Sequence, residues 1–472
     1  MDSKFEHRVK KRIHVISVGG GVMHALAIHL HEQGHIVTGS DDVIYDPSRT
    51  KLERAGLLPE RLGWSAQRVT SDIDLILVGM HAKPDNPELQ EAQRLGLNIY
   101  DYPSYIAQVY AEDKQRIVVA GSHGKTSTTA MIMHVLKSLK YSFDYLIGYS
   151  TPGFESNISL SQEASIIVIE GDEYPSGPQN LSPKFIQYRA HIGVITGLAW
   201  DHVNHYPSPE DYVGHFRDFV QAMDRSGILI YNQIEDELRA LCTSSQNPHV
   251  ELKPYSLPKY RIQEEITYVL HGAKAHPLKI FGKHNLLNIA AAATVCRCLA
   301  VSDEEFYQAI ESFPGVDQRL KRISTHPLIY RDFAHAPTKA EASTEAVKEQ
   351  HPQQKLAAIL EMHTFSSFNE DFILLYKNRL RSADLCIIYV NPEVLKLRGS
   401  QVFEQDSLRK IFAHKNLLYV KEAKKILSIL KKETDPRGWT YLFMSSGHMG
   451  NISFPDLKNH LVLGDQDSHE LE

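Results

Sequence analysis

Residues 116–127 read RIVVAGSHGKTS and join an apolar run to a glycine-containing turn, after which a helical pattern continues to about Leu139. This order of strand, loop and helix is typical of a phosphate-binding loop, where backbone N–H groups and the helix N-terminus bind phosphate oxygens. In such a loop Lys125 neutralises the outer phosphates and the Thr126 hydroxyl holds Mg²⁺. The usual spacing needs a further glycine at position 119, which is Val119 here, so the loop is a shortened variant. We therefore predict an α/β nucleotide-binding fold with these loop residues: Gly121, His123, Gly124, Lys125, Thr126 and Ser127.

Acidic and histidine residues follow two further strand-like runs of the same segment. The apolar run 166–169 ends in the sequence EGDEY at 170–174, and the run 192–196 leads to Asp201-His202. Ligands bind at the carboxyl ends of parallel strands, and Mg²⁺ takes only one or two protein carboxylates. We favour Glu170 as that carboxylate, and His202 as a metal ligand or a phosphate-orienting group; a solvated acidic turn and a structural histidine are the alternatives. The predicted metal site is Thr126, Glu170 and His202, and the predicted catalytic set is Lys125, Glu170 and His202.

The start of the chain has the layout of a mononucleotide-binding βαβ unit. An apolar strand at 13–18 is followed by Gly19-Gly20-Gly21, a helical stretch to about Gln33 and a second strand at 36–41. A parallel sheet is the natural interpretation. One alternative function follows from these glycines and Asp41, a nicotinamide-dependent oxidoreductase, but it leaves Lys125 and Thr126 without a role.

Two later segments carry weaker signals for nucleotide contacts. Asn285 and Asn288 precede a predicted helix at 290–300, and two amides at this spacing share one helical face. They are candidates for binding an adenine edge, although without further context helix capping is the better interpretation of Asn285. Asp332 ends a predicted strand and His335 follows it, so we expect both to face the nucleotide across an interdomain cleft.

Length and composition fit an ordinary globular protein of several domains. The 472 residues suit about three domains, and we place their boundaries at 1–112, 113–318 and 319–472. The net charge of −6 disfavours nucleic acid and acidic membranes as partners, and no apolar run reaches the roughly 20 residues of a membrane helix. Four scattered cysteines do not suit a disulfide framework. We expect a cytoplasmic protein that is a monomer or a weak homo-oligomer.

Taken together, six stretches resemble the Mur ligases, which assemble the peptide of bacterial cell-wall precursors. They are GSHGKTS at 121–127, EGDEY at 170–174, DH at 201–202, GKHNLLN at 282–288, Arg319 after Gly315-Val316, and DFAHAPT at 332–338. The resemblance implies a UDP-sugar-binding N-terminal domain, a central ATPase domain and a Rossmann-like C-terminal domain that binds the incoming amine. It also implies that ATP and Mg²⁺ activate a substrate carboxylate as an acyl phosphate, which the amine attacks to give an amide, ADP and phosphate. The residues implied for ATP are Asn285, Asn288, Arg319, Asp332 and His335 beside the loop, and those implied for the UDP-sugar are Gly20, Gly21 and Asp41.

The resemblance is compatible with two alternative amine substrates. Residues 169–174, 183–185 and 444–450 favour ligation of the tripeptide L-alanyl-γ-D-glutamyl-meso-diaminopimelate to UDP-N-acetylmuramate, and the alternative amine is L-alanine. The chain departs from the family pattern at Ser17, Gly197 and Ala199, where glycine, asparagine and glutamate are usual, and in the segment 361–366, which lacks the usual proline and arginine. A regulator that binds nucleotide without catalysis is the remaining alternative.

Overall fold

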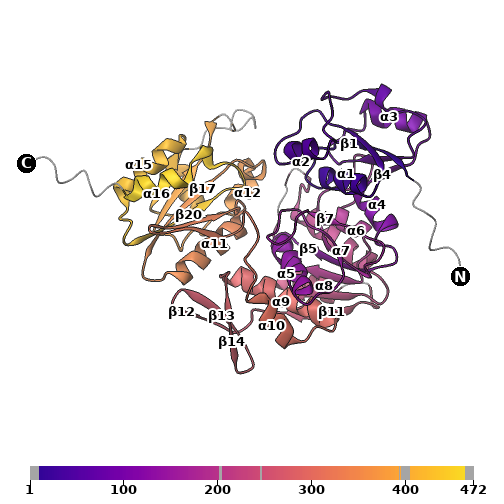
Figure 1. Cartoon of the computed structure of the whole chain (residues 1–472). Helices are drawn as coiled ribbons and strands as arrows, with labels where there is room; N and C mark the ends of the chain where they lie inside the picture. Colours follow the sequence, from indigo (N-terminus) through magenta and orange to yellow (C-terminus); the bar gives the residue numbers. More distant parts are fainter. Residues whose placement is uncertain are drawn as a thin grey trace, which may run out of the picture. The chain divides into compact units, whose positions relative to one another are not determined.

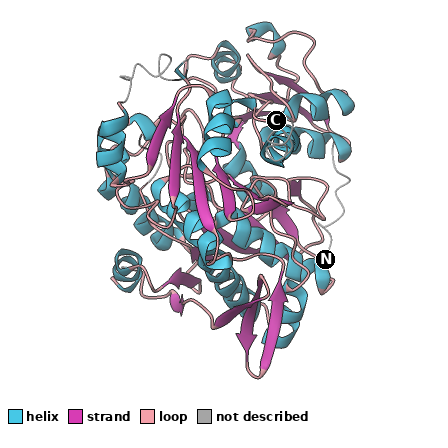
Figure 2. Cartoon of the chain, turned by 90° about the vertical axis from the view of Figure 1, so that its left-hand side faces the viewer, coloured by secondary structure: helices cyan, strands magenta, loops and turns pink. Residues whose placement is uncertain are grey.

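The computed structural model describes residues 10–200, 203, 205–244, 247–392, 394 and 404–462. The chain divides into two compact units (Figure 1). The first contains Met1–Leu198, Gly214–Tyr255 and Ala291–Ser302; the second contains Ala199–Val213, Ser256–Ala290 and Asp303–Glu472. Strands gather into sheets with helices packed beside them (Figure 2), so the predicted α/β class is confirmed.

The first unit begins with a parallel four-stranded sheet in the order β2-β1-β3-β4. Its elements are β1 (Arg12–Ile16), α1 (Met23–Glu32), β2 (Ile36–Ser40), α2 (Ser48–Arg54), η1 (Ala66–Arg68), β3 (Leu75–Val78), α3 (Pro87–Arg94), β4 (Ile99–Asp101) and α4 (Tyr102–Val109). Local sequence sets the helix starts: Asn86 accepts hydrogen bonds from two backbone N–H groups of α3, and Asp101 accepts one from Ser104 of α4. Such side-chain caps satisfy donors that have no partner within the helix.

A seven-stranded sheet follows in the order β11-β10-β9-β5-β8-β6-β7, parallel except where β7 joins β6. The strands are β5 (Gln115–Ala120), β6 (Asp144–Leu146), β7 (Ile158–Ser159), β8 (Ile166–Glu170), β9 (Ile192–Ile195), β10 (Ile228–Asn232) and β11 (Glu251–Tyr255). The helices between residues 125 and 310 are α5 (Lys125–Ser138), α6 (Lys184–Gln187), α7 (Pro209–Ala222), α8 (Asp236–Thr243), α9 (Lys283–Cys298) and α10 (Asp303–Ile310). Of these, α10 belongs to the second unit. The strands that precede the predicted site residues, β5, β8 and β9, are neighbours in the middle of the sheet.

The two sheets of the first unit are joined by direct polar contacts. His29 lies in α1 and Gln33 directly follows this helix. The Nε2 atom of His29 and the side-chain amide nitrogen of Gln33 each lie 3.0 Å from the carbonyl oxygen of Leu160. The amide of Asn180 donates to Asp101 at 3.0 Å. These contacts pack the two sheets together within the first unit.

The second unit contains an antiparallel sheet of β12 (Tyr260–Gln263), β13 (Ile266–His271) and β14 (Lys274–Leu278). Its larger sheet has the order β15-β16-β20-β17-β18-β19, with only β15 antiparallel. The elements are β15 (Lys321–Thr325), β16 (Leu328–Asp332), α11 (Pro337–Gln350), β17 (Lys355–Glu361), η2 (Ser366–Phe368), α12 (Glu370–Leu374), β18 (Leu385–Tyr389), α14 (Gln405–Phe412), β19 (Leu417–Val420), α15 (Ala423–Glu433), β20 (Trp439–Met444), η3 (Met449–Asn451) and α16 (Phe454–Val462). Alternate residues of β17 pack into two different apolar clusters, so helices cover both faces of this sheet.

The structure corrects one predicted element. Helix α9 begins at Lys283, not near residue 290, so Asn285 and Asn288 lie inside the helix. The amide of Asn285 donates to the carbonyl oxygen of Phe281 at 2.9 Å, back over the first turn of the helix. The alanine-rich composition hid this start, because the predicted helix was assigned to the alanines alone. The domain boundaries placed after residues 112 and 318 stay predictions.

Candidate functional site

The loop after β5 has the backbone shape that its glycines permit. Gly121 and Gly124 have φ angles of +125° and +77°, in the region that side chains disfavour, and Gly124 directly precedes α5. A Cβ atom on Gly121 would collide with the hydroxyl of Thr196 at the end of β9. That hydroxyl contacts the carbonyl oxygens of Ala120 and His123, so β9 fixes the loop from the neighbouring strand.

Lys125, the first residue of α5, is held inside the loop by a buried carboxylate. Its Nζ atom lies 2.5 Å from Oε2 of Glu173, which is 2% exposed, and donates to the carbonyl oxygen of Gly121 at 2.6 Å. Burial favours the neutral amine, but the charge and hydrogen bond of Glu173 outweigh it and raise the pKa of Lys125 above its ordinary value. The ammonium is therefore charged and positioned where a phosphate-binding loop needs it.

Thr126 and Glu170 meet beside this lysine. The Thr126 hydroxyl donates to Oε1 of Glu170 at 2.7 Å, and the backbone N–H of Gly148 donates to Oε2 at 2.7 Å. Within the described residues no group of three or more metal-ligating side chains is found. A hydroxyl and one carboxylate, both oxygen donors, nevertheless fit Mg²⁺, which keeps waters and phosphate oxygens as its other ligands. The third predicted metal ligand, His202, and the adjacent Asp201 lie outside the described residues.

His123 pairs with an acid that sequence analysis did not identify. Its Nε2 atom lies 3.5 Å from Oε1 of Glu235, and the other carboxylate oxygen accepts from the N–H of Leu198 at 3.1 Å. Burial opposes ionisation of Glu235, yet His123 lowers the pKa of this carboxyl below its ordinary value. A Cβ atom on Gly197 would collide with the His123 ring, so the departure from asparagine at this position has a steric reason.

The glycine turn after β1 meets Asp41 at the end of β2. The N–H of Gly19 donates to Oδ2 of Asp41 at 2.7 Å. Burial, opposed by this hydrogen bond, raises the pKa of Asp41 to about 6. Ser17, where the family usually has glycine, has a φ angle of +65°, which explains the usual preference for glycine. The structure brings Gly20, Gly21 and Asp41 to the carboxyl edge of the sheet, where a nucleotide ligand is expected.

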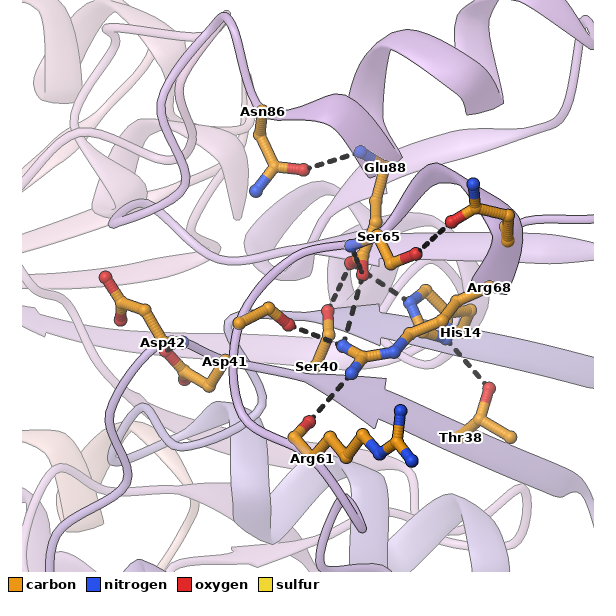
Figure 3. Close-up of polar contacts among 12 residues, drawn as sticks. His14, Thr38, Ser40, Asp41, Asp42, Arg61, Ser65, Arg68, Asn86 and Glu88 are labelled. Atoms are coloured by element: carbon orange, nitrogen blue, oxygen red, sulfur yellow. Dashed lines mark hydrogen bonds and ion pairs between the residues drawn. The ribbon is translucent and has the colours of Figure 1, made fainter.

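A buried network centred on Glu88 supports this edge (Figure 3). Glu88 is fully buried in α3, and its carboxylate contacts the Ser40 hydroxyl, the Ser65 N–H at 2.9 Å and His14 at 3.3 Å. Arg68 lies 3.4 Å from the same carboxylate. Ser40 is the last residue of β2 and directly precedes Asp41. The contact of its hydroxyl with Glu88 therefore holds the end of β2 in place.

The remaining predicted ATP contacts lie in the second unit. Arg319 stacks over the ring of Phe333, 5.1 Å from its centroid, and Nδ1 of His335 lies 2.8 Å from the carbonyl oxygen of Phe333. Burial raises the pKa of Asp332, opposed by a hydrogen bond from Ser343 and by the charge of Arg319. The structure therefore brings Arg319, Asp332 and His335 together around the end of β16, while their contact with ATP stays a prediction.

The same sheet edge carries a second polar group in the segment that departs from the family pattern. Glu361, at the end of β17, accepts from the hydroxyl of Ser445 and from the N–H of Met449 at 2.8 Å. Nε2 of His363 lies 3.2 Å from the hydroxyl of Ser446, which follows β20. These polar side chains stand at the carboxyl ends of adjacent parallel strands, a usual location for ligand binding.

Sequence analysis missed Glu173 and Glu235 as partners of the loop. Glu173 was visible as part of EGDEY, but nothing in the sequence singles it out as the partner of Lys125. Glu235 follows the apolar strand β10, the same signal that identified Glu170, and that signal would have found it. Glu88 is a helix residue far along the chain from its partners, and it carries no local signal.

A phosphate loop, an oxygen-donor pair and a second nucleotide-type sheet edge together define an α/β enzyme that uses a nucleoside triphosphate. Two family models match: the Mur ligase family catalytic domain over residues 12–114, and the Mur ligase middle domain over residues 119–296. Together they span more than half of the chain, which therefore belongs to the Mur ligase family and is an ATP-dependent amide ligase. No helix among the described residues has the length and apolar character needed to cross a membrane.

Relatives of known name match over nearly the whole length. A UDP-N-acetylmuramate–L-alanine ligase of Streptococcus agalactiae serotype III (strain NEM316) is 26% identical, over 97% of this chain and 100% of the relative. A murein peptide ligase of Psychrobacter arcticus 273-4 has a TM-score of 0.64 at 20% identity, and a UDP-N-acetylmuramate-alanine ligase of Thermotoga maritima has 0.68 at 22%. Each of these structures covers 96% of this chain and 98% of its own. The predicted three-domain architecture is thus confirmed.

Proposed function

We propose that this ligase joins the carboxylate of UDP-N-acetylmuramate to the amine of L-alanyl-γ-D-glutamyl-meso-diaminopimelate, a reaction of cell-wall peptide recycling in the cytoplasm. The use of ATP in this proposal is supported by the contact of Thr126 with Glu170, which lies beside the charged Lys125. The residues at 169–174, 183–185 and 444–450 support the tripeptide as the amine.

The first chemical step needs stabilisation of charge on the transferred phosphoryl group. A carboxylate oxygen of the sugar attacks the γ-phosphorus, and ADP leaves with the electrons of the broken P–O bond. Lys125 stabilises the developing charge from within the loop, an effect of position and electrostatics rather than of covalent chemistry. Glu173 and Gly121 hold the ammonium in the loop, so contacts within the protein orient it for a phosphate group.

The neutral amine then attacks the acyl carbon, the C–O bond to phosphate breaks with its electron pair going to phosphate, and the nitrogen loses one proton to solvent. Thr126 and Glu170 are the described residues that would hold Mg²⁺, and the bound ion would neutralise phosphate charge. For the incoming amine we propose the edge formed by Glu361, His363 and Ser446. The carboxylate oxygens of Glu361 are hydrogen-bond acceptors that would hold the N–H groups of this amine.

L-Alanine is the second candidate amine, favoured by the names of relatives such as the streptococcal ligase. Phosphate release with ATP, Mg²⁺ and UDP-N-acetylmuramate distinguishes the candidates when L-alanine is compared with the tripeptide. Turnover with tripeptide alone supports the recycling reaction, and turnover with L-alanine alone replaces it by the biosynthetic one. ATP binding without turnover on either amine would support a regulator instead.

A further inference from the structure

Lys184, the first residue of α6, is a buried cation with unused hydrogen-bonding capacity. It is 5% exposed, and its Nζ atom donates to Oδ2 of Asp172 at 2.6 Å. The ammonium also lies over the rings of Tyr102 and Tyr174, 5.5 and 5.7 Å from their centroids. An ammonium has three N–H donors, and Asp172 is its only hydrogen-bond acceptor among the described residues. Two donors are therefore left for a ligand.

The position of Lys184 relates it to both sheet edges of the first unit. Asp172 follows β8, two residues after Glu170, whereas Tyr102 directly follows β4 of the N-terminal sheet. Burial and the positive charge of Lys184 lower the pKa of His81, which comes shortly after β3. The ammonium consequently lies between Tyr102, at the carboxyl end of β4 in the N-terminal sheet, and Asp172, at the carboxyl end of β8.

The fold holds this lysine by more than its charge. The backbone N–H of Lys184 donates to the carbonyl oxygen of Tyr174 at 3.1 Å, and that of Phe185 donates to Asp172 at 3.3 Å. Burying an ammonium is costly unless its charge and its hydrogen bonds are satisfied. Here one carboxylate balances the charge and two aromatic faces add attraction, while the hydrogen bonds stay incomplete.

We propose that Lys184 binds the carboxylate of the sugar nucleotide that ATP phosphorylates. This assignment rests on the proposed function and identifies the residue that presents the carboxylate. The second anionic group of the same substrate, its diphosphate, has a better place at the glycine turn Gly19–Gly21 and the start of α1. Lys184 instead pairs with Asp172, which comes two residues after Glu170 and whose negative charge also contributes to raising the pKa of Lys125 in the phosphate loop. No bond to Lys184 forms or breaks.

A second buried lysine of the same unit provides the matched control. Lys114 is 6% exposed, contacts Asp144 and donates to the carbonyl oxygen of Ser161 at 2.5 Å. It directly precedes β5 and so lies at the amino ends of the strands, away from both ligand edges. Replacing either lysine removes a buried ammonium from its aspartate partner, but only Lys184 belongs to the carboxyl ends of the strands, where ligands bind.

The test measures binding of three ligands to the full-length protein by calorimetry. UDP-N-acetylmuramate carries both anionic groups, UDP-N-acetylglucosamine lacks the carboxylate, and UDP carries the diphosphate alone. We expect Lys184→Met to weaken UDP-N-acetylmuramate binding about 10- to 100-fold, the usual value of a hydrogen bond to a charged group, and to leave the other two ligands unchanged. Lys114→Met should leave all three unchanged. If the single variant does not fold, the double variant Lys184→Met/Asp172→Asn, which removes both charges of the pair, is measured with the same three ligands and should give the same result.

If Lys184→Met weakened the binding of all three ligands equally, the assignment would be wrong, and Lys184 would instead bind the diphosphate. Unchanged binding of UDP-N-acetylmuramate would overturn it as well. Turnover of the unmodified protein, measured in the same preparation, separates this outcome from failure of the proposed function. An active wild type with an unaffected Lys184→Met rejects only the role of Lys184, whereas a wild type that neither binds nor turns over UDP-N-acetylmuramate rejects both.

Discussion

Each end of the seven-stranded sheet has a buried lysine paired with an aspartate, and the two pairs differ. Asp144 is buried with its lysine, whereas the side chain of Asp172 is 35% exposed. At the amino ends, Lys114 has two acceptors, and Asp144 accepts further hydrogen bonds from the N–H and hydroxyl of Ser161, both at 2.9 Å. At the carboxyl ends, Lys184 has one acceptor and two aromatic neighbours. A closed network stabilises the fold, whereas an open one leaves donors for a ligand. We therefore expect the Lys114 pair to stabilise the fold and the Lys184 pair to bind a ligand, although both belong to the same sheet.

The largest effect is expected at the carboxyl ends, in the loop itself. Lys125→Ala should lower the rate of phosphate release at least 1,000-fold or so, because charge on the phosphoryl group loses its fixed counter-ion. Lys137→Ala, in the exposed last turn of the same helix, should stay near the unmodified rate. A loss smaller than about tenfold for Lys125→Ala would contradict the assignment of the loop.

A substitution at the amino ends of the strands should lower the free energy of unfolding and leave catalysis unchanged. Lys114→Met leaves Asp144 buried without its cation, and breaking such a pair costs about 3–5 kcal/mol. Urea unfolding should show this loss, while the KM values for ATP and the sugar nucleotide stay unchanged. A change in either KM of more than about threefold would contradict the division between the two ends, since it would exceed about 0.7 kcal/mol of binding energy.

A smaller effect is expected where β9 meets the loop. Gly197→Ala adds a Cβ atom that displaces the His123 ring from Glu235, so the KM for ATP should rise about five- to tenfold, the value of one hydrogen bond. Gly214→Ala in α7, where a Cβ atom has open space, is the matched control and should leave this KM unchanged. Steady-state kinetics with varied ATP provide the measurement, and equal KM values for both variants would show that His123 does not support the loop.

The smallest effect concerns Asp41 at the carboxyl edge of the N-terminal sheet. Its pKa is raised from 3.8 to about 6, so the folded state holds this proton more tightly than the unfolded chain. Asp41 therefore contributes stability fully below pH 4, and this contribution is lost as the pH rises through 6. Hydrogen exchange of β1 and β2 between pH 4 and 7 should show this dependence in the unmodified protein and not in Asp41→Asn. Parallel profiles for the two proteins would contradict the raised pKa.

The sequence determined the elements that carry the chemistry, because their signals are local. Glycines before a helix, an apolar strand before an acid, and a turn after a strand all depend on neighbours in the chain, and β5, β8 and β9 lie within about two residues of their predicted ranges. Helix α9 was placed too late because its alanine-rich part obscured the start at Lys283. Asn285 and Asn288 were therefore predicted to precede the helix, whereas they lie inside it.

Only the tertiary structure decided which charged groups meet. Lys125 with Glu173, His123 with Glu235, and Lys184 with Asp172 are pairs that several strands of a sheet bring together. Sequence shows the charge of each partner but not its burial, and burial decides whether a pair stabilises the fold, shifts a pKa or leaves donors for a substrate. The reason is physical: local patterns depend on a few adjacent residues, whereas burial and electrostatic partners depend on the packing of the whole unit.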